Sequence, residues 1–326
     1  MSNQGWLFTG AHEPLVLSDV PAPTAAQGEV VLDVAAAGLC HSDIGIIEGP
    51  GAAWITNLPI VLGHEVAGTI REIGPGVEGF APGDRVAIGL LAHGDDKKTG
   101  WDAPGLSRNG GYEQLAIAQA SELVVIPDNV SFAQAAAATD SVTTAYHAVV
   151  AEGGVRAGTV VGVIGMGGLG MNAVQIADAI GAEVHGVDTS EGARDRAREF
   201  GIASVHADAG ELAQYQPEII FDFAGFGTTT AAAIEAVRTG GRVVLVGLGA
   251  IEATISTNLL VTKQVTLIGS SGGSKDDLKT VLSMISDGTI TNIVEEIPFD
   301  TLPEGIRRLS AGEVVGRLVL DVAGAN

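Results

Sequence analysis

The chain has 326 residues, of which 46% are hydrophobic and 17% are charged. This length allows two domains with separate cores, and the abundant glycine fits a loop-rich α/β enzyme better than a helical bundle. Acidic residues outnumber basic residues by 39 to 17, for a formal charge of −22, and such a surface repels phosphate backbones and anionic lipids, so neither nucleic acid nor membrane is an expected partner.

The start of the chain carries no recognisable targeting signal. Residues 1–10 lack a basic stretch followed by an apolar core, and no apolar run reaches the roughly 18 residues that span a bilayer. We therefore expect a cytoplasmic protein. Cys40 is the single cysteine of the sequence, which excludes an intrachain disulfide and a structural zinc site built from several cysteines.

Short β-rich runs separated by glycine and proline fill the region from about Glu29 to Ala118. Two such runs are 29–34 and 84–88, and turn signals follow one another at 74–76 and 81–84. This pattern predicts an antiparallel, barrel-like domain.

The pattern changes between about Val142 and Gly272, where continuous apolar strands alternate with helical stretches. Strands of this kind are typical of a parallel sheet covered on both faces. The expected strands are 160–164, 183–187, 219–222, 242–246 and 264–268, and a helix over 275–286 and a β segment at 317–320 follow them. We therefore expect an α/β protein in which residues 1–141 and 273–326 form the barrel-like domain. Residues 142–272 then form a doubly wound domain.

A glycine-rich turn lies between an expected strand and an expected helix. Gly165, Gly167 and Gly170 fill the three glycine positions of G-x-G-x-x-G, with Gly168 and Leu169 between the last two. Glycines at these positions allow a tight turn, close approach of a pyrophosphate and close packing of helix on strand. The helix N-terminus also favours negative charge, so the turn predicts a dinucleotide site.

An acidic residue, Asp188, ends the next expected strand about 20 residues further on. Its carboxylate would accept hydrogen bonds from the ribose hydroxyls of NAD and repel the 2′-phosphate of NADP. We therefore expect NAD, although the nearby Arg194 leaves NADP open. The alternative is a purely structural turn, with Asp188 capping a loop.

Two short segments of the first region contain potential metal ligands. They are Gly38–Asp43, which reads Gly-Leu-Cys-His-Ser-Asp, and Gly63–Gly68, which reads Gly-His-Glu-Val-Ala-Gly. Cysteine and histidine are usual zinc ligands, and a catalytic site needs three protein ligands and one open position. Taken separately, Cys40 also fits a buried thiol and His64 a core or loop histidine.

Together the two segments resemble the zinc-dependent alcohol dehydrogenases of the medium-chain dehydrogenase/reductase superfamily. Members carry a G-x-C-x-S/T-D segment and a signature that begins G-H-E-x-x-G, which runs here from Gly63 through Gly74 to Val77, with Gly-Asp-Arg-Val following at 83–86. The domain order agrees as well, so the resemblance covers nearly the whole chain. It implies a GroES-like catalytic domain, a Rossmann cofactor domain and hydride transfer between an alcohol or carbonyl carbon and NAD(H).

The resemblance implies a role for several residues near the metal. Cys40 and His64 correspond to ligands of the catalytic zinc, and Asp140 stands where many relatives have a third ligand, a cysteine. Thiolate, neutral imidazole and carboxylate still bring two negative charges to Zn²⁺. The alternative for Asp140 is a helix cap or a hydrogen bond at the domain junction. Glu65 corresponds to a carboxylate that approaches the metal during ligand exchange, and Asp43 to one that orients the ligand histidine, unless either is an ordinary buried ion-pair partner.

The resemblance also implies residues for proton transfer and for cofactor binding. Ser42 corresponds to the hydroxyl that hydrogen-bonds the substrate oxygen and passes its proton toward the cofactor ribose, or else is a turn residue. The implied cofactor contacts are His41 and Arg317 near the phosphates, Thr144 on the nicotinamide, and Val246 and Leu248 at the carboxamide. The alternative for Arg317 is a surface charge.

Two departures from the family affect the expected chemistry. Gly45 stands where many relatives place the histidine that ends the proton relay, so the proton must leave by another route. Residues 91–109 form a short polar loop without cysteine, where many relatives insert a lobe that binds structural zinc. We therefore expect one catalytic zinc per subunit and no structural zinc.

Substrate and assembly are less constrained by the sequence. Trp54 and Trp101 are candidates for the pocket wall, or else surface or core aromatics. Without a cluster of basic residues, the expected substrate is a small neutral primary or secondary alcohol, or the matching aldehyde or ketone. The resemblance implies a homodimer or homotetramer, because family members usually pair through an edge strand of the Rossmann sheet, and residues 259–261 and 264–268 are the candidates for that edge. The alternatives are a polyol or sugar dehydrogenase, a zinc-free reductase and a non-catalytic NAD-binding protein.

Overall fold

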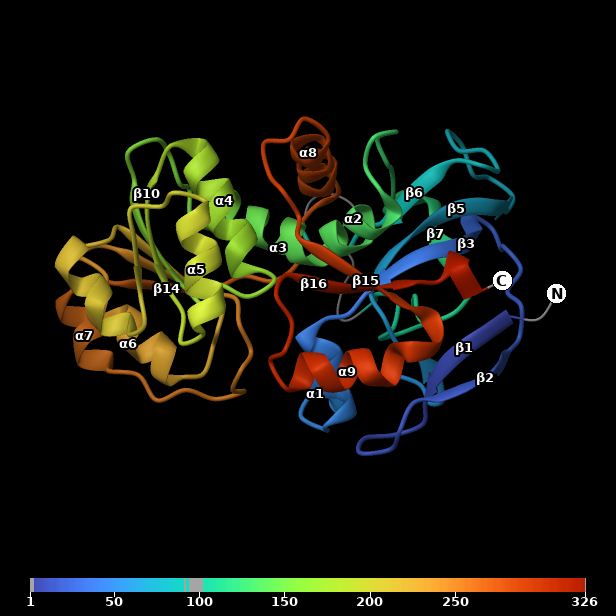
Figure 1. Cartoon of the computed structure of the whole chain (residues 1–326), viewed down its shortest axis with the longest axis horizontal. Helices are drawn as coiled ribbons and strands as arrows, with labels where there is room; N and C mark the ends of the chain where they lie inside the picture. The colour runs from blue at the N-terminus through green and yellow to red at the C-terminus, as the bar shows by residue number, and fades with distance from the viewer. Residues whose placement is uncertain (1–2, 91, 94–101, 326) are drawn as a thin grey trace. The chain divides into compact units, whose positions relative to one another are not determined.

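The computed structural model describes residues 3–90, 92–93 and 102–325, and the chain forms two compact units (Figure 1). The first comprises Met1–Thr143, Gly272–Gly288 and Asn292–Asn326, and the second comprises Thr144–Ser271 and Thr289–Thr291. The predicted domain ranges, divided at 141/142 and 272/273, stay predictions. Within the described ranges, no helix has the length and apolar character needed to cross a membrane.

The first unit is built mainly from antiparallel strands. Its strands are β1 (Asn3–Phe8), β2 (Val16–Val20), β3 (Glu29–Gly38), β4 (Ile60–Val61), β5 (Glu65–Ile73), β6 (Arg85–Ile88), β7 (Leu115–Gln119), β8 (Leu123–Val125), β15 (Val294–Pro298) and β16 (Arg317–Asp321). Its helices are α1 (His41–Ile47), α2 (Phe132–Ala137), α8 (Lys275–Ser286) and α9 (Leu302–Ser310). One sheet has the order β2-β1-β4; the other has the order β15-β16-β3-β5-β6-β8, with β7 also paired to β3.

Strands β3 and β5 bring the two predicted ligand segments together. Alternate residues of a strand share a face, and Val30, Leu32 and Val34 of β3 lie in the apolar core of this unit. The two strands pair in antiparallel register, with Gly38 opposite Glu65. The end of β3, which leads to Cys40, therefore lies beside the start of β5, which follows His64.

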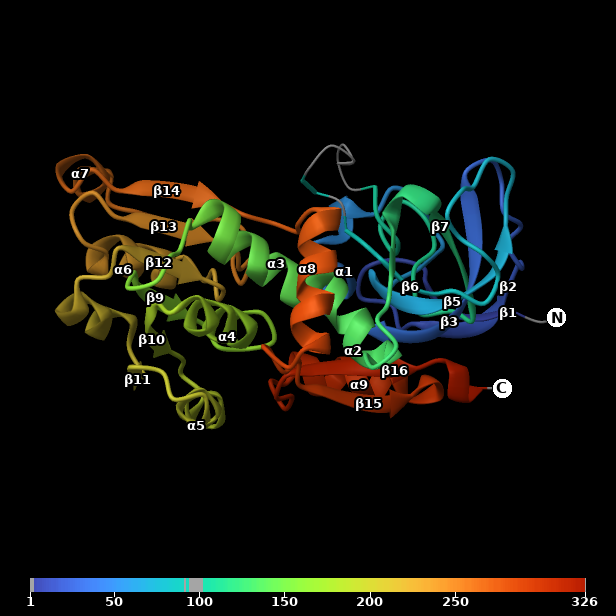
Figure 2. The same cartoon turned by 90° about the horizontal axis from the view of Figure 1, so that it is seen from above.

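The helix that carries Asp140 begins with a well-formed cap. The Ser131 hydroxyl accepts a hydrogen bond from the Gln134 N–H, and the Gln134 side chain accepts one from the Ser131 N–H, at 3.1 Å each. Such reciprocal caps satisfy two helix-end donors. α2 then continues into a π-helical turn at Ala138–Val142, against which α8 packs (Figure 2). π-helical turns are frequent at functional sites.

The second unit is a six-stranded parallel sheet with helices around it (Figure 2). Its strands are β9 (Val160–Ile164), β10 (Glu183–Val187), β11 (Ser204–His206), β12 (Ile219–Asp222), β13 (Arg242–Leu245) and β14 (Thr266–Gly269). Its helices are α4 (Gly170–Ile180), α5 (Glu191–Glu199), α6 (Thr228–Ala236) and α7 (Thr257–Thr262), and α3 (Thr143–Tyr146) lies at its start. The order β11-β10-β9-β12-β13-β14 is that of doubly wound dinucleotide-binding folds. The predicted fold class is confirmed.

A buried carboxyl in the first unit makes its stability depend on pH. Glu113 is buried, and Asn3 and Asn109 donate hydrogen bonds to its Oε2 at 3.1 and 3.4 Å. Burial raises the pKa of Glu113 to about 8, although the two amides lower it. Between its usual pKa and pH 8 the folded chain keeps a proton that the unfolded chain has released, so the free energy of unfolding falls as pH rises through this window.

Replacing Glu113 with glutamine is therefore expected to stabilise the protein most at high pH. Relative to wild type, Glu113→Gln should gain about 2–4 kcal/mol in unfolding free energy between pH 5 and pH 9. Urea unfolding of both proteins at the two pH values measures this gain. An equal stability difference at pH 5 and pH 9 would show that Glu113 does not titrate in the folded protein.

Candidate metal and cofactor sites

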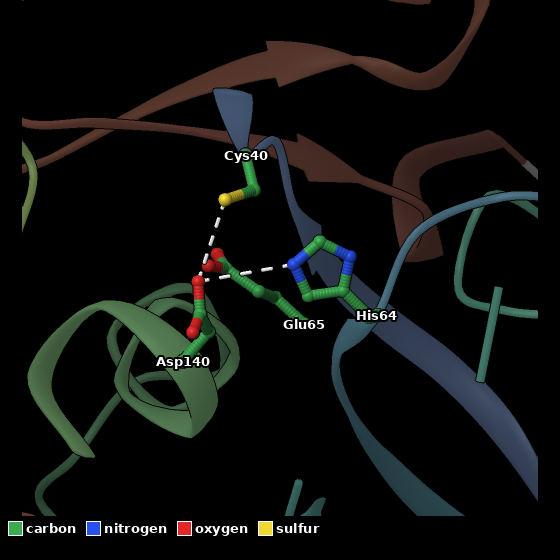
Figure 3. A group of neighbouring side chains, drawn as sticks. All are labelled: Cys40, His64, Glu65 and Asp140. Carbon is green, nitrogen blue, oxygen red and sulfur yellow. Dashed lines mark hydrogen bonds and ion pairs between the residues drawn. The ribbon is translucent and has the colours of Figure 1, made fainter. Parts of the chain in front are cut away.

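Three side chains from separate segments of the first unit converge on one point (Figure 3). Cys40 precedes α1, His64 precedes β5, and Asp140 lies in the π-helical turn. Asp140 Oδ2 lies 3.4 Å from Cys40 Sγ and 3.8 Å from His64 Nε2. The three residues are only 8%, 7% and 9% exposed, so their donor atoms face a confined interior position.

The spacing of these atoms fits a single metal ion. Zinc bonds of 2.0–2.3 Å at tetrahedral angles separate two donor atoms by roughly 3.3–3.8 Å, a range that includes the distances between Asp140 Oδ2 and its two neighbours. With Glu65, the donor atoms of this group all lie within 4.8 Å of one another. A thiolate, an imidazole and a carboxylate are also a usual zinc donor set.

Asp43 fixes the position of two of these residues. It is buried; its Oδ1 lies 3.5 Å from His64 Nδ1, and its Oδ2 accepts hydrogen bonds from the Cys40 N–H at 3.0 Å and the Tyr112 hydroxyl at 2.8 Å. A carboxylate at Nδ1 leaves Nε2 free to face the metal position. Tyr112 carries no motif in the sequence, so its role as a support for Asp43 becomes visible only in the structure.

The ionisation of this group reflects its burial and its charges. Burial raises the pKa of Asp43, but the charge of His64 and hydrogen bonds from His64, Cys40 and Tyr112 outweigh it, so the pKa lies below its usual value. For His64, burial lowers the pKa, but Asp43 and Asp140 raise it well above its usual value. Because a metal binds neutral imidazole, metal binding is coupled to proton release.

Arg317, on β16, is the cation in contact with the cluster. Its Nε lies 3.0 Å from both Glu65 carboxylate oxygens, and its Nη2 donates to Glu65 Oε1 and, at 2.9 Å, to Asp140 Oδ2. The residue is 3% exposed, so the alternative of a surface charge is wrong. Its predicted contact with a cofactor phosphate stays a prediction.

Other residues singled out in the sequence lie around this cluster. Ser42 is half-buried, with its Oγ 3.4 Å from His64 Nε2, and His41 is the exposed first residue of α1. Trp54 is half-buried in a short helical turn and packs against the apolar core of the first unit. Trp101 lies outside the described residues. The roles assigned to these residues stay predictions.

The glycine-rich turn of the second unit connects β9 to α4. Gly165 adopts a positive φ of 84°, and a Cβ on Gly170 would lie 1.8 Å from the Gly165 carbonyl oxygen. Among the described residues, by contrast, no atom lies within 4 Å of the position of a Cβ on Gly167. The turn is therefore tight where helix meets strand and open at its second glycine, where a pyrophosphate would approach.

Asp188 lies at the end of β10, next to this turn. Its Oδ2 accepts a hydrogen bond from the Met166 N–H at 2.7 Å, and its Oδ1 accepts one from the Ser190 N–H at 2.8 Å. Arg194 donates through Nη1 to the carbonyl oxygens of Asp188 and Thr189, at 2.8 Å each. A fixed carboxylate beside the glycine turn fits the ribose of a dinucleotide.

The remaining predicted cofactor residues also belong to the second unit. Thr144 is buried, whereas Leu248 is exposed. The Val246 N–H donates to the carbonyl oxygen of Asp222. Because this N–H is already bonded, the Val246 carbonyl is the backbone group that would contact the nicotinamide carboxamide. Gly168 and Leu169 complete the turn before α4. These contacts with a cofactor stay predictions.

Two family models match the chain. The model described as alcohol dehydrogenase GroES-like domain matches residues 26–128, and the model described as zinc-binding dehydrogenase matches residues 168–287. An alcohol dehydrogenase of Geobacillus stearothermophilus is 34% identical over 330 residues, which cover 95% of this chain and 97% of the relative. An alcohol dehydrogenase of Moraxella sp. (strain TAE123) is 30% identical, with 95% of this chain and 96% of the relative covered.

Solved structures agree with these matches. Acetophenone reductase from Geotrichum candidum, solved in complex with NAD, superposes with a TM-score of 0.88 at 31% identity, covering 98% of this chain and 97% of that one. The alcohol dehydrogenase from the archaeon Aeropyrum pernix also gives a TM-score of 0.88, at 27% identity, covering 98% and 99% of the two chains.

Proposed function

The chain belongs to the zinc-dependent alcohol dehydrogenases of the medium-chain dehydrogenase/reductase family, and we propose from this premise how its own residues perform the reaction. It is an NAD-dependent oxidoreductase that interconverts alcohols with aldehydes or ketones. The observation that carries this conclusion is the convergence of Cys40, His64 and Asp140 in a chain that also has the dinucleotide turn.

Cys40, His64 and Asp140 would hold one catalytic zinc. Zinc supplies a Lewis acid that favours loss of the alcohol proton in oxidation and polarises the carbonyl group in reduction. Asp43 orients the His64 ring, and Glu65 lies close enough to take part in ligand exchange. With a single cysteine in the sequence, no structural zinc site of several cysteines is available, so we propose one zinc per subunit.

Ser42 would accept the alcohol proton. Its half-buried hydroxyl lies 3.4 Å from His64 Nε2, beside the position that the substrate oxygen takes if His64 is a ligand. A hydroxyl there can accept one proton and donate its own. Gly45 has no side chain that could accept the proton from Ser42. The proton relay therefore continues through a group other than residue 45.

NAD is the proposed cofactor, in preference to NADP. The Asp188 carboxylate is held by two backbone N–H groups, and its charge opposes a 2′-phosphate. Arg194 donates hydrogen bonds to the carbonyl oxygens of Asp188 and Thr189. Its guanidinium therefore lies at the same loop, but the backbone already occupies its Nη1 group.

Removing the charge of Asp188 is expected to reduce this preference. Asp188→Asn keeps one of the two oxygens that accept backbone N–H groups, weakens ribose binding and ends repulsion of the 2′-phosphate. Hydrogen bonds to charged groups contribute about 1.5–3 kcal/mol, so the ratio of kcat/KM for NAD to that for NADP should fall about 10–100-fold. Asp178→Asn, an exposed carboxylate on α4, is the matched control. An unchanged ratio in Asp188→Asn would rule out this role.

The substrate is proposed to be a small neutral primary or secondary alcohol, or the corresponding carbonyl compound. The alternatives are a polyol or sugar dehydrogenase and a non-catalytic NAD-binding protein. NADH formation over a panel of primary alcohols, secondary alcohols and polyols separates them. Turnover of polyols alone would favour the first alternative, and zinc-free protein that binds NADH without turnover would favour the second.

We also propose that the chain assembles as a homodimer or homotetramer in the cytoplasm. Strand β14 is at the edge of the parallel sheet, and Val261 and Leu267 are exposed nearby, which fits pairing of two copies along this edge. Light scattering tests the assembly, and a monomer at all concentrations would contradict it. Cell fractionation tests the location.

A further inference from the structure

A buried arginine connects two carboxylates of the metal cluster. The Arg317 guanidinium contacts both oxygens of Glu65 through Nε, while its Nη2 also donates to Asp140 Oδ2 at 2.9 Å. Asp140 Oδ2 is the same atom that lies 3.4 Å from Cys40 Sγ and 3.8 Å from His64 Nε2. The arginine therefore holds the carboxylate oxygen that faces the other two donors.

This contact can determine which oxygen of a carboxylate ligand faces the metal, a choice that does not arise for a thiolate. A carboxylate has two equivalent oxygens and rotates about its last bond, so a neighbouring donor must determine which oxygen faces the metal. Outer donors of this kind orient metal ligands in many sites. Asp140 is on a helical turn, and the guanidinium that reaches it is itself fixed by Glu65.

The two carboxylates of the cluster also favour a cation at this place. The donor oxygens of Glu65 and Asp140 lie within 4.8 Å of one another in the interior. Like charges repel strongly in such surroundings. A planar guanidinium can contact two carboxylates at once in a fixed geometry, whereas an ammonium group acts as a point charge.

We propose that Arg317 is a positioning residue that orients Asp140 Oδ2 as a metal ligand and keeps Glu65 and Asp140 together. This inference rests on the proposed zinc site. It also predicts that the requirement for Arg317 is specific to a carboxylate at position 140. A cysteine at that position has one donor atom and needs no guanidinium to select it.

The test is zinc affinity, measured by competition with a chromophoric chelator on the purified full chain. Arg317→Lys keeps the buried positive charge but removes the planar group, and its zinc dissociation constant should rise about 10–100-fold. In cobalt-substituted protein, the visible d–d bands, which depend on ligand geometry, should shift. Arg308→Lys is the matched control, because Arg308 pairs with Glu295 at the surface, and it should bind zinc as wild type does.

A second background separates positioning from general support. In Asp140→Cys protein, adding Arg317→Lys should change zinc affinity less than threefold. An equal loss in both backgrounds, or wild-type affinity and cobalt spectrum in Arg317→Lys alone, would overturn the inference. Wild-type protein that binds no zinc would instead remove the proposed function itself, so the two failures are distinguishable.

Discussion

Replacing Asp140 with alanine is expected to abolish metal binding and the activity that depends on it. The substitution removes the oxygen that lies 3.4 Å from Cys40 Sγ and 3.8 Å from His64 Nε2. It leaves two protein ligands, one fewer than a catalytic zinc site needs. Loss of an outer-shell partner already costs about 10–100-fold in metal affinity or activity. Asp140→Ala should therefore lose more than about 100-fold in kcat/KM, and most of its zinc by plasma mass spectrometry.

Two further variants show whether the loss of zinc and activity in Asp140→Ala comes from the loss of a metal ligand. Asp140→Cys supplies a different zinc ligand at the same position and should retain zinc. Asp128→Ala removes an exposed carboxylate of the same unit and should leave both zinc and activity unchanged. Asp140→Ala protein that keeps a full complement of zinc and wild-type turnover would show that Asp140 is not a ligand.

The glycine turn is expected to respond differently at its two ends. A Cβ on Gly170 would lie 1.8 Å from the Gly165 carbonyl oxygen and 2.9 Å from its carbon, and neither backbone atom can move without opening the turn. Gly170→Ala should therefore lower the unfolding free energy by about 1–3 kcal/mol, and NADH binding should weaken more than tenfold because the turn no longer closes.

Gly167→Ala is the matched variant in the same turn. Among the described residues, its Cβ meets no atom within 4 Å, so stability should change by less than about 0.5 kcal/mol. NADH should still bind more than tenfold more weakly, because the added methyl group lies where the pyrophosphate approaches. Urea unfolding and NADH fluorescence titration measure the two effects. Equal loss of stability in both variants would contradict this view of the turn.

Elements defined by local patterns are predictable from the sequence. The expected helix over 275–286 coincides with α8 and the expected strand over 160–164 with β9, because apolar periodicity and end signals are local. The paired strands β1 and β2 and the helix α9 are not expected, because their apolar patterns are short.

The contacts within the site are less predictable, because they join distant segments. The motifs indicate Cys40 and His64, but the neighbours of Arg317 depend on the pairing of β16 with β3, across almost the whole chain. Tyr112 supports Asp43 without belonging to any motif. The π-helical turn that carries Asp140 has no signal in the sequence.

Metal content of the wild-type protein tests the central claim most directly. We predict close to one zinc per subunit by plasma mass spectrometry, with NAD-dependent alcohol oxidation that is lost on chelation and restored by zinc. Two zinc atoms per subunit would contradict the proposal of a single catalytic site. Carefully prepared protein that contains no zinc and still oxidises alcohols at full rate would contradict the account as a whole.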